Sequence, residues 1–516
     1  MKKILSNIYT LAALCMMGAA TFMACSSDNA AVEQKPEQPT GKTYTMTVNA
    51  SKGMDTRALT LDGSTLNATW NEGEIVEVYQ SGSKIGELTA AASTDASTTL
   101  TGSFAEAPST SANLMFYFHS NATPSYSGQD GTLETIASTY DFCAPATVTV
   151  GNFTVDAVKK EISVPGGISF GANQQAIVKF TLQDKASDAD LSASILSIEV
   201  NGYIYAIIPA SATNVFYVAL PEISNKKVSL FAKTAAGWYS YNRANVSFAN
   251  GEYYAIGAKL TQTGMLPGVF SVGASETVRF SQGNLQATYN GSAWTWAFAA
   301  DQYSHVGFGA ANSAITGNGT ITSTGTVDLF GWSTNATYYG IHDSYDESTY
   351  SGDFVDWGTN AITNGGNSAN MWSTLTKDQW TYIINNHSYA KAYLFGTTQG
   401  VILLPDHYTH PNDVPDLTGV NDATSSTSWY HGNEYDTEQW AKMEAAGAVF
   451  LPSAGWRVGT SVRDAGYDGS AKYWSSTTHP SVATAAYDFV FGYDNLKVGA
   501  SYRLVGESVR LVKTVE

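Results

Sequence analysis

Charged residues are scarce in this sequence. Asp, Glu, Lys and Arg make up 14% of its 516 residues, against about 25% in typical soluble domains. Basic residues are the scarcer kind, with 27 Lys and Arg against 45 Asp and Glu, and the net charge is −18. A coiled coil or a long helical bundle needs Glu and Lys in quantity, so both are excluded. Because phosphate binding needs clustered Lys and Arg, the composition also argues against a nucleic-acid partner.

Glycine, tyrosine and small polar residues fill the space that charged residues leave. The chain has 46 Gly and 30 Tyr, and its hydrophobic fraction is 43%. Aromatic and β-branched side chains fit a pleated sheet, and Gly and Asn suit hairpin turns. The composition therefore favours a mainly β protein, and the length allows about three domains.

The N-terminal residues are typical of an export signal. Lys2 and Lys3 precede a largely apolar stretch, 4–23, that polar residues interrupt and that is poorly suited to span a membrane. The following MACSSD at 23–28 resembles a bacterial lipobox, in which cleavage exposes a lipid-modified cysteine. We therefore predict a signal peptide over 1–24, lipid on Cys25, and attachment to the membrane through that lipid only. The alternative is a plain secretory signal with an incidental cysteine.

Only three cysteines occur, at 15, 25 and 143. If the first leaves with the signal and the second carries lipid, Cys143 stands alone and the mature chain has no internal disulfide. We expect Cys143 to be a buried small hydrophobe rather than a nucleophile.

Residues 25–42 contain no aromatic residue and are predicted to be a flexible tether. Short strand patterns then run from 43 to 264; in the first, Tyr44, Met46 and Val48 alternate with threonines. Two β-sandwiches fit this length, over 43–165 and 166–264, with a seam at the Pro-Gly-Gly turn signal. Further strands are predicted at 74–79, 83–89, 113–119, 176–182, 214–220, 228–233 paired with 238–242, and 252–260.

Residues 265–516 differ in composition from what precedes them. Ten of the twelve tryptophans and seven of the eight histidines lie here. Thr376 to Gln379 and Asp436 to Gln439 each have the spacing of a helix capping box, and Gly447 is placed to end the second helix. We predict one α+β domain with two helices and long loops, and expect it to fold and bind a surface when expressed alone.

Three stretches of the first half resemble the fimbrillin-like surface lipoproteins of gut and oral Bacteroidales. They are 57–79 (RALTLDG through GEIVEVY), 173–180 (NQQAIVKF) and 253–260 (YYAIGAKL). The resemblance implies two transthyretin-like sandwiches, location in the outer membrane, at the cell surface or in a fimbrium, and assembly with other pilin subunits by donor-strand exchange. In that family an arginine-specific protease removes the first strand. The resemblance places such a cleavage between Arg57 and Ala58; the alternative is that Arg57 is an ordinary surface residue.

The second half resembles C-type-lectin-like modules of secreted Bacteroidetes proteins. The matching stretches, in order, are 278–285 (VRFSQGNL), 328–332 (DLFGW), 447–457 (GAVFLPSAGWR), 473–477 (YWSST) and 508–512 (SVRLV). The related fold of formylglycine-generating enzymes works through a cysteine pair, and 265–516 contains no cysteine. Enzymatic activity therefore does not carry over.

Candidate binding residues are aromatic and acidic side chains in the loops of the second half. The aromatic residues predicted to form a ligand surface are Trp332, Trp357, Trp372, Trp429, Tyr339 and Tyr345. Asp343, Asp346, Asp353 and Asp356 carry hard oxygen ligands suited to Ca²⁺, but we favour a solvated acidic loop and predict no metal or cofactor. His407 and His410 lack the helical spacing of a zinc hydrolase, which indicates a loop pair.

Two functions fit these patterns. The first is a fimbrial subunit and adhesin, at the tip because 511–516 ends inside the lectin-like domain and leaves no strand to donate. In such a subunit, the two sandwiches assemble with other pilin subunits, and the C-terminal domain binds a host or microbial glycan or protein. The alternative is a cell-surface glycan- or protein-binding lipoprotein that never polymerises.

Overall fold

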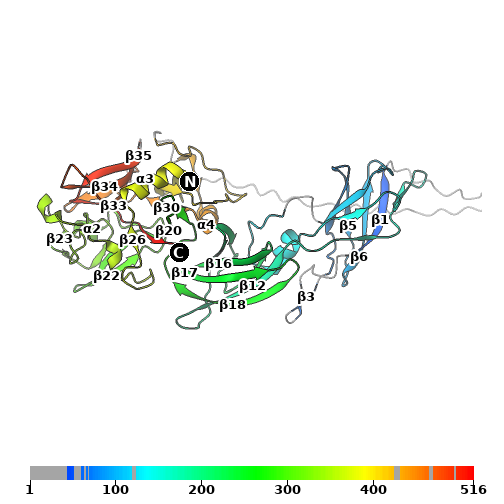
Figure 1. Cartoon of the computed structure of the whole chain (residues 1–516), viewed down its shortest axis with the longest axis horizontal. Helices are drawn as coiled ribbons and strands as arrows, with labels where there is room; N and C mark the ends of the chain where they lie inside the picture. Colours follow the sequence, from blue (N-terminus) through cyan, green and yellow to red (C-terminus); the bar gives the residue numbers. More distant parts are fainter. Residues whose placement is uncertain are drawn as a thin grey trace, which may run out of the picture. The chain divides into compact units, whose positions relative to one another are not determined.

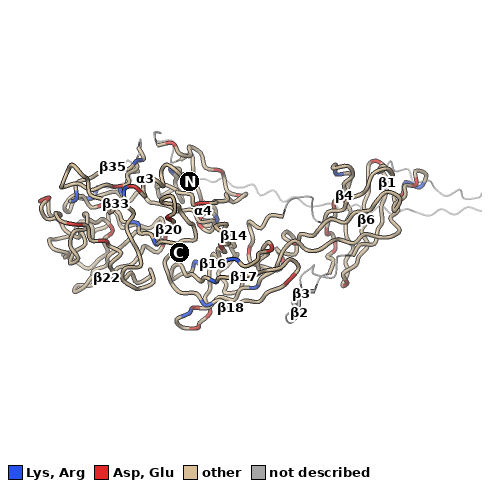
Figure 2. The backbone as a smooth tube through the Cα atoms, viewed as in Figure 1, with Lys and Arg blue, Asp and Glu red and all other residues tan. Residues whose placement is uncertain are grey.

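The computed structural model describes residues 43–51, 60–62, 65–67, 69–118, 124–423, 431–463, 469–492 and 495–515. These residues form a mainly β protein, which confirms the predicted fold class (Figure 1). Cys25, Arg57, Ala58 and Trp429 lie outside the described residues. Within the described part, no helix is long and apolar enough to cross a membrane. Figure 2 shows the charged residues as separate short segments on a backbone that is otherwise uncharged over long stretches.

The first sheet has nine strands in the order β8-β7-β4-β5-β6-β1-β10-β9, with β11 also paired to β1. It is built mainly from antiparallel neighbours, and β1 pairs in parallel with β10 and β11. A separate hairpin joins β2 (Thr60–Asp62) to β3 (Thr65–Asn67). The strands of the sheet are β1 (Tyr44–Ser51), β4 (Ile75–Gln80), β5 (Ser83–Ala90), β6 (Ser97–Phe104), β7 (Leu114–Phe118), β8 (Ala146–Val148), β9 (Thr154–Asp156), β10 (Glu161–Ser163) and β11 (Ile168–Ser169).

One apolar core lies under this sheet. Met46, Val76, Val78 and Leu88 are fully buried in it, because alternate residues of each strand point to the same face. Trp70 is buried in the same core, edge-on to the ring of Phe118 with 5.4 Å between the ring centroids. Cys143 is half-buried and packs against this cluster, close to its predicted role as a small hydrophobe.

The second sheet has seven strands in the order β14-β13-β16-β17-β18-β12-β15. Its longest hairpin, β16 with β17, contains the predicted pair and extends beyond it at both ends. β12 lies parallel to β18 and antiparallel to β15. The strands are β12 (Ala176–Asp184), β13 (Ile195–Val200), β14 (Tyr203–Ile207), β15 (Val215–Leu220), β16 (Ile223–Thr234), β17 (Gly237–Phe248) and β18 (Tyr253–Gln262).

The predicted seam at the Pro165-Gly166-Gly167 turn is wrong. β10 precedes this turn and β11 follows it, yet both pair with β1, so the turn lies inside the first sheet. Before β8, moreover, the chain packs on the second sheet through the short helical turns α1 (Leu133–Thr135) and η1 (Ile136–Tyr140). Ile136 and Tyr140 are buried against Ile177 and Ala219. The two sheets are therefore not built from two consecutive segments.

The C-terminal region consists of short sheets of two to four strands around two longer helices. Both predicted capping boxes are present, at Thr376 for α3 and at Asp436 for α4, and each is closed by the Gln three residues later. Gly447 has φ +99°, the left-handed region that follows a helix end. The elements are β19 (Phe270–Ser271), β20 (Thr277–Phe280), β21 (Leu285–Tyr289), β22 (Trp294–Phe298), α2 (Ala310–Ser313), β23 (Ile315–Thr316), β24 (Thr320–Ile321), β25 (Gly325–Val327), η2 (Glu347–Tyr350), η3 (Trp357–Thr359), β26 (Ser373–Thr374), α3 (Lys377–Asn386), β27 (Tyr389–Leu394), β28 (Thr398–Leu403), β29 (Glu434–Tyr435), α4 (Thr437–Ala445), β30 (Val449–Pro452), β31 (Trp456–Val458), β32 (Ser461–Arg463), β33 (Ala471–Thr478), β34 (Ala485–Phe491), β35 (Leu496–Tyr502), β36 (Val505–Gly506) and β37 (Leu511–Thr514).

The second sheet and the C-terminal region share one hydrophobic core. Ile195, Phe231 and Trp238 of the sheet belong to the same buried cluster as Leu266 and Phe280. Polar contacts cross the same junction. Lys233 pairs with Asp301 at 2.9 Å and with the buried Glu444 at 2.8 Å, and the Ser197 hydroxyl donates to the Ala445 carbonyl at 2.7 Å.

Candidate functional site

The strand β1 fills an apolar slot in the first sheet. Met46, Val48 and Ala50 are each no more than 2% exposed, while the residues between them face solvent. Burying a Met or Val side chain is worth about 1.5–3 kcal/mol. The strand β1 therefore supplies part of the core of the first sheet.

Both long edges of β1 are hydrogen bonded. On one side it pairs antiparallel with β6 along its whole length, from Tyr44 opposite Phe104 to Ser51 opposite Ser97 (Figure 1). On the other side β10 pairs with 45–47 and β11 pairs with 50–51. Without β1, two neighbouring strand edges would have unpaired N–H and C=O groups, and the apolar core residues that β1 covers would be exposed. Such an edge accepts another extended chain.

Gly167 sets the turn that brings β11 onto β1. It has φ +68°, and a Cβ atom there would lie 2.7 Å from the Asn49 carbonyl oxygen. A larger residue would push β11 off the strand, so the slot depends on this glycine. At the other end of β1, the Lys160 ammonium lies 4.5 Å from the centroid of the Tyr44 ring.

Three of the predicted ligand-surface residues are buried, so the prediction is wrong for them. Trp332 and Trp357 are fully buried and Trp372 is 4% exposed. Each indole N–H donates to a backbone carbonyl: Trp332 to Ser475 at 2.9 Å, Trp357 to Tyr339 at 2.9 Å and Trp372 to Gly365 at 2.8 Å. An indole whose N–H finds a carbonyl partner can be buried whole. These rings hold the loops together and offer no free face to a ligand.

The two predicted tyrosines are in different settings. Tyr345 is 66% exposed, and its hydroxyl donates to the Val458 carbonyl at 3.3 Å. Tyr339 is half-buried, with its hydroxyl 3.1 Å from that of Thr359. Tyr345 therefore stays a prediction as a ligand contact, and Tyr339 offers only part of its surface.

The acidic residues of the same loops act as acceptors for backbone N–H groups. Asp346 caps η2 by accepting from Ser348 N at 2.9 Å, and Asp356 caps η3 by accepting from Gly358 N at 2.9 Å. Asp343 accepts from Gly317 N at 2.9 Å. Across the residues that the structure describes, no group of three His, Cys, Asp or Glu side chains is placed to hold a metal ion. Asp343, Asp346, Asp353 and Asp356 therefore form no such group.

His407 and His410 have separate partners. The His407 ring lies over Tyr203 with 5.1 Å between the ring centroids, whereas His410 Nε2 lies 3.1 Å from the Val414 carbonyl oxygen. The two side chains thus act as packing and loop contacts, as their spacing predicted.

A cavity of about 770 Å³ lies where this histidine loop meets the second sheet. Sequence reasoning missed it, because its walls come from four segments of the chain. The segments are 125–129, the 203–210 stretch that contains β14, 409–413, and 438–446 along and just after α4. The only local signal was the pair of alternating tyrosines, Tyr203 and Tyr205.

No model of a known protein family matches the sequence, and no curated protein matches it. Among solved structures, a candidate cell adhesion protein from Bacteroides uniformis ATCC 8492 is 14% identical with a TM-score of 0.25, over 43% of this chain and 94% of that one. A fimbrial assembly protein from Parabacteroides distasonis ATCC 8503 is 11% identical with a TM-score of 0.23, over 46% and 96%. The shaft pilin SpaA from Lactobacillus rhamnosus GG is 12% identical with a TM-score of 0.21, over 44% and 100%. At such low TM-scores these likenesses say nothing about function.

Proposed function

We propose that this protein is a surface lipoprotein that assembles into fimbriae by exchange of its first strand. The observation that carries the proposal is the position of β1, an N-terminal strand held on both edges over an apolar core. Removing it would leave a slot shaped for an extended chain with alternate apolar residues. A donor strand from another pilin subunit has that pattern and would restore the lost pairing.

Cleavage between Arg57 and Ala58 is the step proposed to open the slot. The bond follows β1 in sequence and lies ahead of the remaining strands of the first sheet. Lipid on Cys25 would hold the uncleaved chain at the outer membrane. We propose no catalytic role.

We propose the tip of the fimbrium as its position. A shaft subunit must donate a strand as well as accept one. β37, the last described strand, is hydrogen bonded to β20 on one edge and β26 on the other, and Leu511 and Val512 are buried. It is therefore not available for donation in this fold, whereas β1 occupies a slot that accepts.

Recognition of a host or microbial surface is proposed to reside in the C-terminal region together with the second sheet. The expectation that 265–516 folds alone does not fit the structure, because Trp238 and Phe231 complete the core of that region. The assembly function then belongs to the first sheet, and the recognition function to the unit that follows it.

N-terminal sequencing of protein from intact cells and isolated fibres tests the proposal. Wild-type protein in fibres should begin at Ala58. The Arg57→Ala protein should not be cleaved after residue 57, should still begin at Cys25, and should be absent from fibres. Arg243→Ala, an exposed arginine of β17, is the matched control and should assemble normally. Fibres built from protein that begins at Cys25 would refute cleavage and strand exchange.

The second candidate function is a surface-binding lipoprotein that does not polymerise. The complete pairing of β1 in the intact chain favours it, since such a fold is stable without a partner. Binding to cells or glycans by protein that never appears in fibres would support this alternative.

A further inference from the structure

The 770 Å³ cavity has the size of a small-molecule site. Ligand pockets in proteins measure about 300–1,000 Å³ and combine apolar or aromatic walls with a few polar groups. This cavity has one wall of tyrosine and aliphatic side chains from the second sheet and from the 125–129 segment, and one wall of mainly polar side chains from the C-terminal region. The two walls belong to the parts that share a hydrophobic core, so the cavity is preformed.

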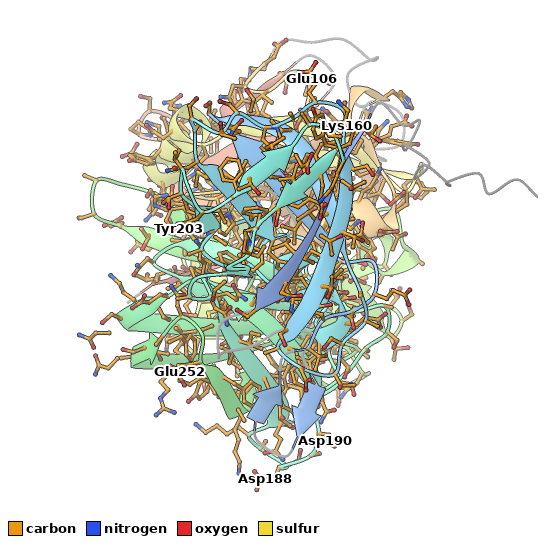
Figure 3. The ribbon with its side chains drawn as sticks, turned by 90° about the vertical axis from the view of Figure 1, so that its right-hand side faces the viewer. Glu106, Lys160, Asp188, Asp190, Tyr203 and Glu252 are labelled. Carbon is orange, nitrogen blue, oxygen red and sulfur yellow. The ribbon has the colours of Figure 1, made fainter. Side chains whose placement is uncertain are left out.

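The aromatic wall presents tyrosine rings in fixed orientations. Tyr203 is 54% exposed on the second sheet (Figure 3), and the His407 ring packs against its ring. Tyr205 meets Tyr126 edge-to-face with 6.3 Å between centroids. Tyr126 is held in place because its hydroxyl donates to the Gln174 carbonyl at 2.7 Å. Burial raises the pKa of Tyr126 to about 12, so this hydroxyl stays protonated.

Free polar groups accompany these rings. Among the described residues, no hydrogen bond engages the Tyr203 hydroxyl, the Tyr205 hydroxyl or the Asn412 carboxamide. All three residues line the cavity, and together they offer both donors and acceptors. A ligand with several hydroxyl groups would satisfy them.

The polar wall carries more negative than positive charge. Lys442 donates to Glu438 at 2.8 Å and also to Asp413. The hydrogen bond from Lys442 holds the pKa of Asp413 below its ordinary value, and bonds to both carboxylates raise the pKa of Lys442. Two carboxylates thus face one ammonium, which leaves one net negative charge, and no Lys or Arg other than Lys442 is among the described residues that line the cavity.

We propose that this cavity binds a neutral oligosaccharide. Sugar rings present apolar CH faces to tyrosine rings and hydroxyl groups to amides and phenols, which matches the two walls. A ligand bearing a carboxylate or sulfate would be repelled by the Asp413–Glu438 pair, and a purely apolar ligand would leave the polar wall unpaired. The inference deepens the proposed recognition function by naming its site and ligand class, and it rests on that function.

The test uses the chain from residue 26 on an array of neutral cello-, xylo-, manno- and malto-oligosaccharides and lacto-N-tetraose. Sialylated or sulfated counterparts are printed beside them. The wild-type protein should bind a neutral glycan and not its acidic counterpart. Tyr203→Ala should weaken that binding at least ten-fold, and Tyr205→Phe should weaken it several-fold through loss of one hydroxyl. Tyr502→Ala is the matched control, because Tyr502 is 55% exposed and lies elsewhere.

A second variant tests the charge argument. Asp413→Asn combined with Glu438→Gln frees Lys442, and it should allow the acidic counterpart to bind. Absence of neutral-glycan binding, or equal binding by wild type and Tyr203→Ala, would overturn the proposal. Cell adhesion measured on the same variants distinguishes failure of the cavity proposal from failure of the proposed recognition function. Adhesion that survives Tyr203→Ala but is lost with Tyr345→Ala would refute the cavity and leave the recognition function standing, whereas no adhesion by any form would refute that function itself.

Discussion

The side-chain amide of Gln129 forms two hydrogen bonds with the backbone of Ala219, in the way that the backbone of a neighbouring strand would. Its Nε2 donates to the Ala219 carbonyl at 2.9 Å, and its Oε1 accepts from Ala219 N at 2.7 Å. The backbone carbonyl of Gln129 also accepts from Ile208 N at 3.0 Å. Ala219 lies in β15 and Ile208 directly follows β14, which are the two end strands of the second sheet. One residue from outside the sheet therefore closes both of its ends.

We expect Gln129→Ala to loosen β15, because the substitution removes both side-chain hydrogen bonds to Ala219 and keeps the backbone carbonyl that accepts from Ile208 N. The substitution leaves the buried N–H and C=O of Ala219 unpaired, and each unpaired group costs about 1–3 kcal/mol. Hydrogen exchange should be faster over β15 (Val215–Leu220) and little changed over β14 (Tyr203–Ile207). Gln262→Ala removes one exposed hydrogen bond to Ala236 and serves as control. Unchanged exchange in Gln129→Ala would mean that the side chain is dispensable.

Val48→Asp should destabilise the first sheet strongly. Val48 is 2% exposed in the core of β1, and a carboxylate has no partner in that slot. An unpaired charge at such a site should cost several kcal/mol, whereas Thr47→Asp, on the exposed face of the same strand, should cost about 0.5 kcal/mol or less. Hydrogen exchange over β1 and β6 at increasing urea concentration gives the comparison. Equal losses for the two variants would contradict the assigned faces of β1.

The pair of capping boxes and the position of Val48 were readable from sequence for the same reason. A capping box involves residues three apart, and strand alternation involves residues two apart, so both signals are local. The burial of Trp332 was not readable, because its N–H partner, Ser475, lies in a distant strand. The misplaced seam has the same origin. Residues 124–142 look like a connection in sequence, and only the tertiary fold shows that Gln129 belongs with the second sheet.

Lys233→Met should destabilise the junction between the second sheet and the C-terminal region. Burial lowers the pKa of Lys233, but Glu444 and Asp301 outweigh this and raise it above its ordinary value. Removing the ammonium leaves Glu444 buried without it, at a cost of about 3–5 kcal/mol. Lys259→Met breaks an exposed pair with Asp188 and should cost about 1 kcal/mol or less. Thermal unfolding of both variants measures the difference. Similar melting temperatures would show that the junction does not depend on this lysine.

Two buried carboxyl groups predict a dependence of stability on pH. Burial, followed by repulsion from Asp488, raises the pKa of Glu507 well above its ordinary value, and burial also raises the pKa of Asp488. The Ser501 hydroxyl donates to Asp488 at 2.7 Å, and Lys472 lies 4.0 Å from Glu507. Because the folded state holds protons that the unfolded state releases, the stability that this pair contributes should be fully present below the ordinary carboxyl pKa and be lost as pH rises through the raised values.

Glu507→Gln should remove much of that slope. The amide cannot ionise, so the variant should lose less stability than wild type between pH 4 and pH 8. Melting temperatures over this range provide the measurement, and Glu434→Gln, an exposed carboxylate beside His431, is the control. Parallel curves for wild type and Glu507→Gln would contradict the assigned pKa shift.

The shared core also fixes how the molecule would respond to pulling. Thr263 N and Gly264 N both donate to the Trp238 carbonyl at 3.0 Å, so the chain that joins the second sheet to the C-terminal region is bonded where it passes the core. No slack segment separates these two parts, and tension applied to a captured surface passes into the β16–β17 hairpin without first extending a linker. The C-terminal region and the second sheet would then unfold together under force, in one cooperative step rather than in two.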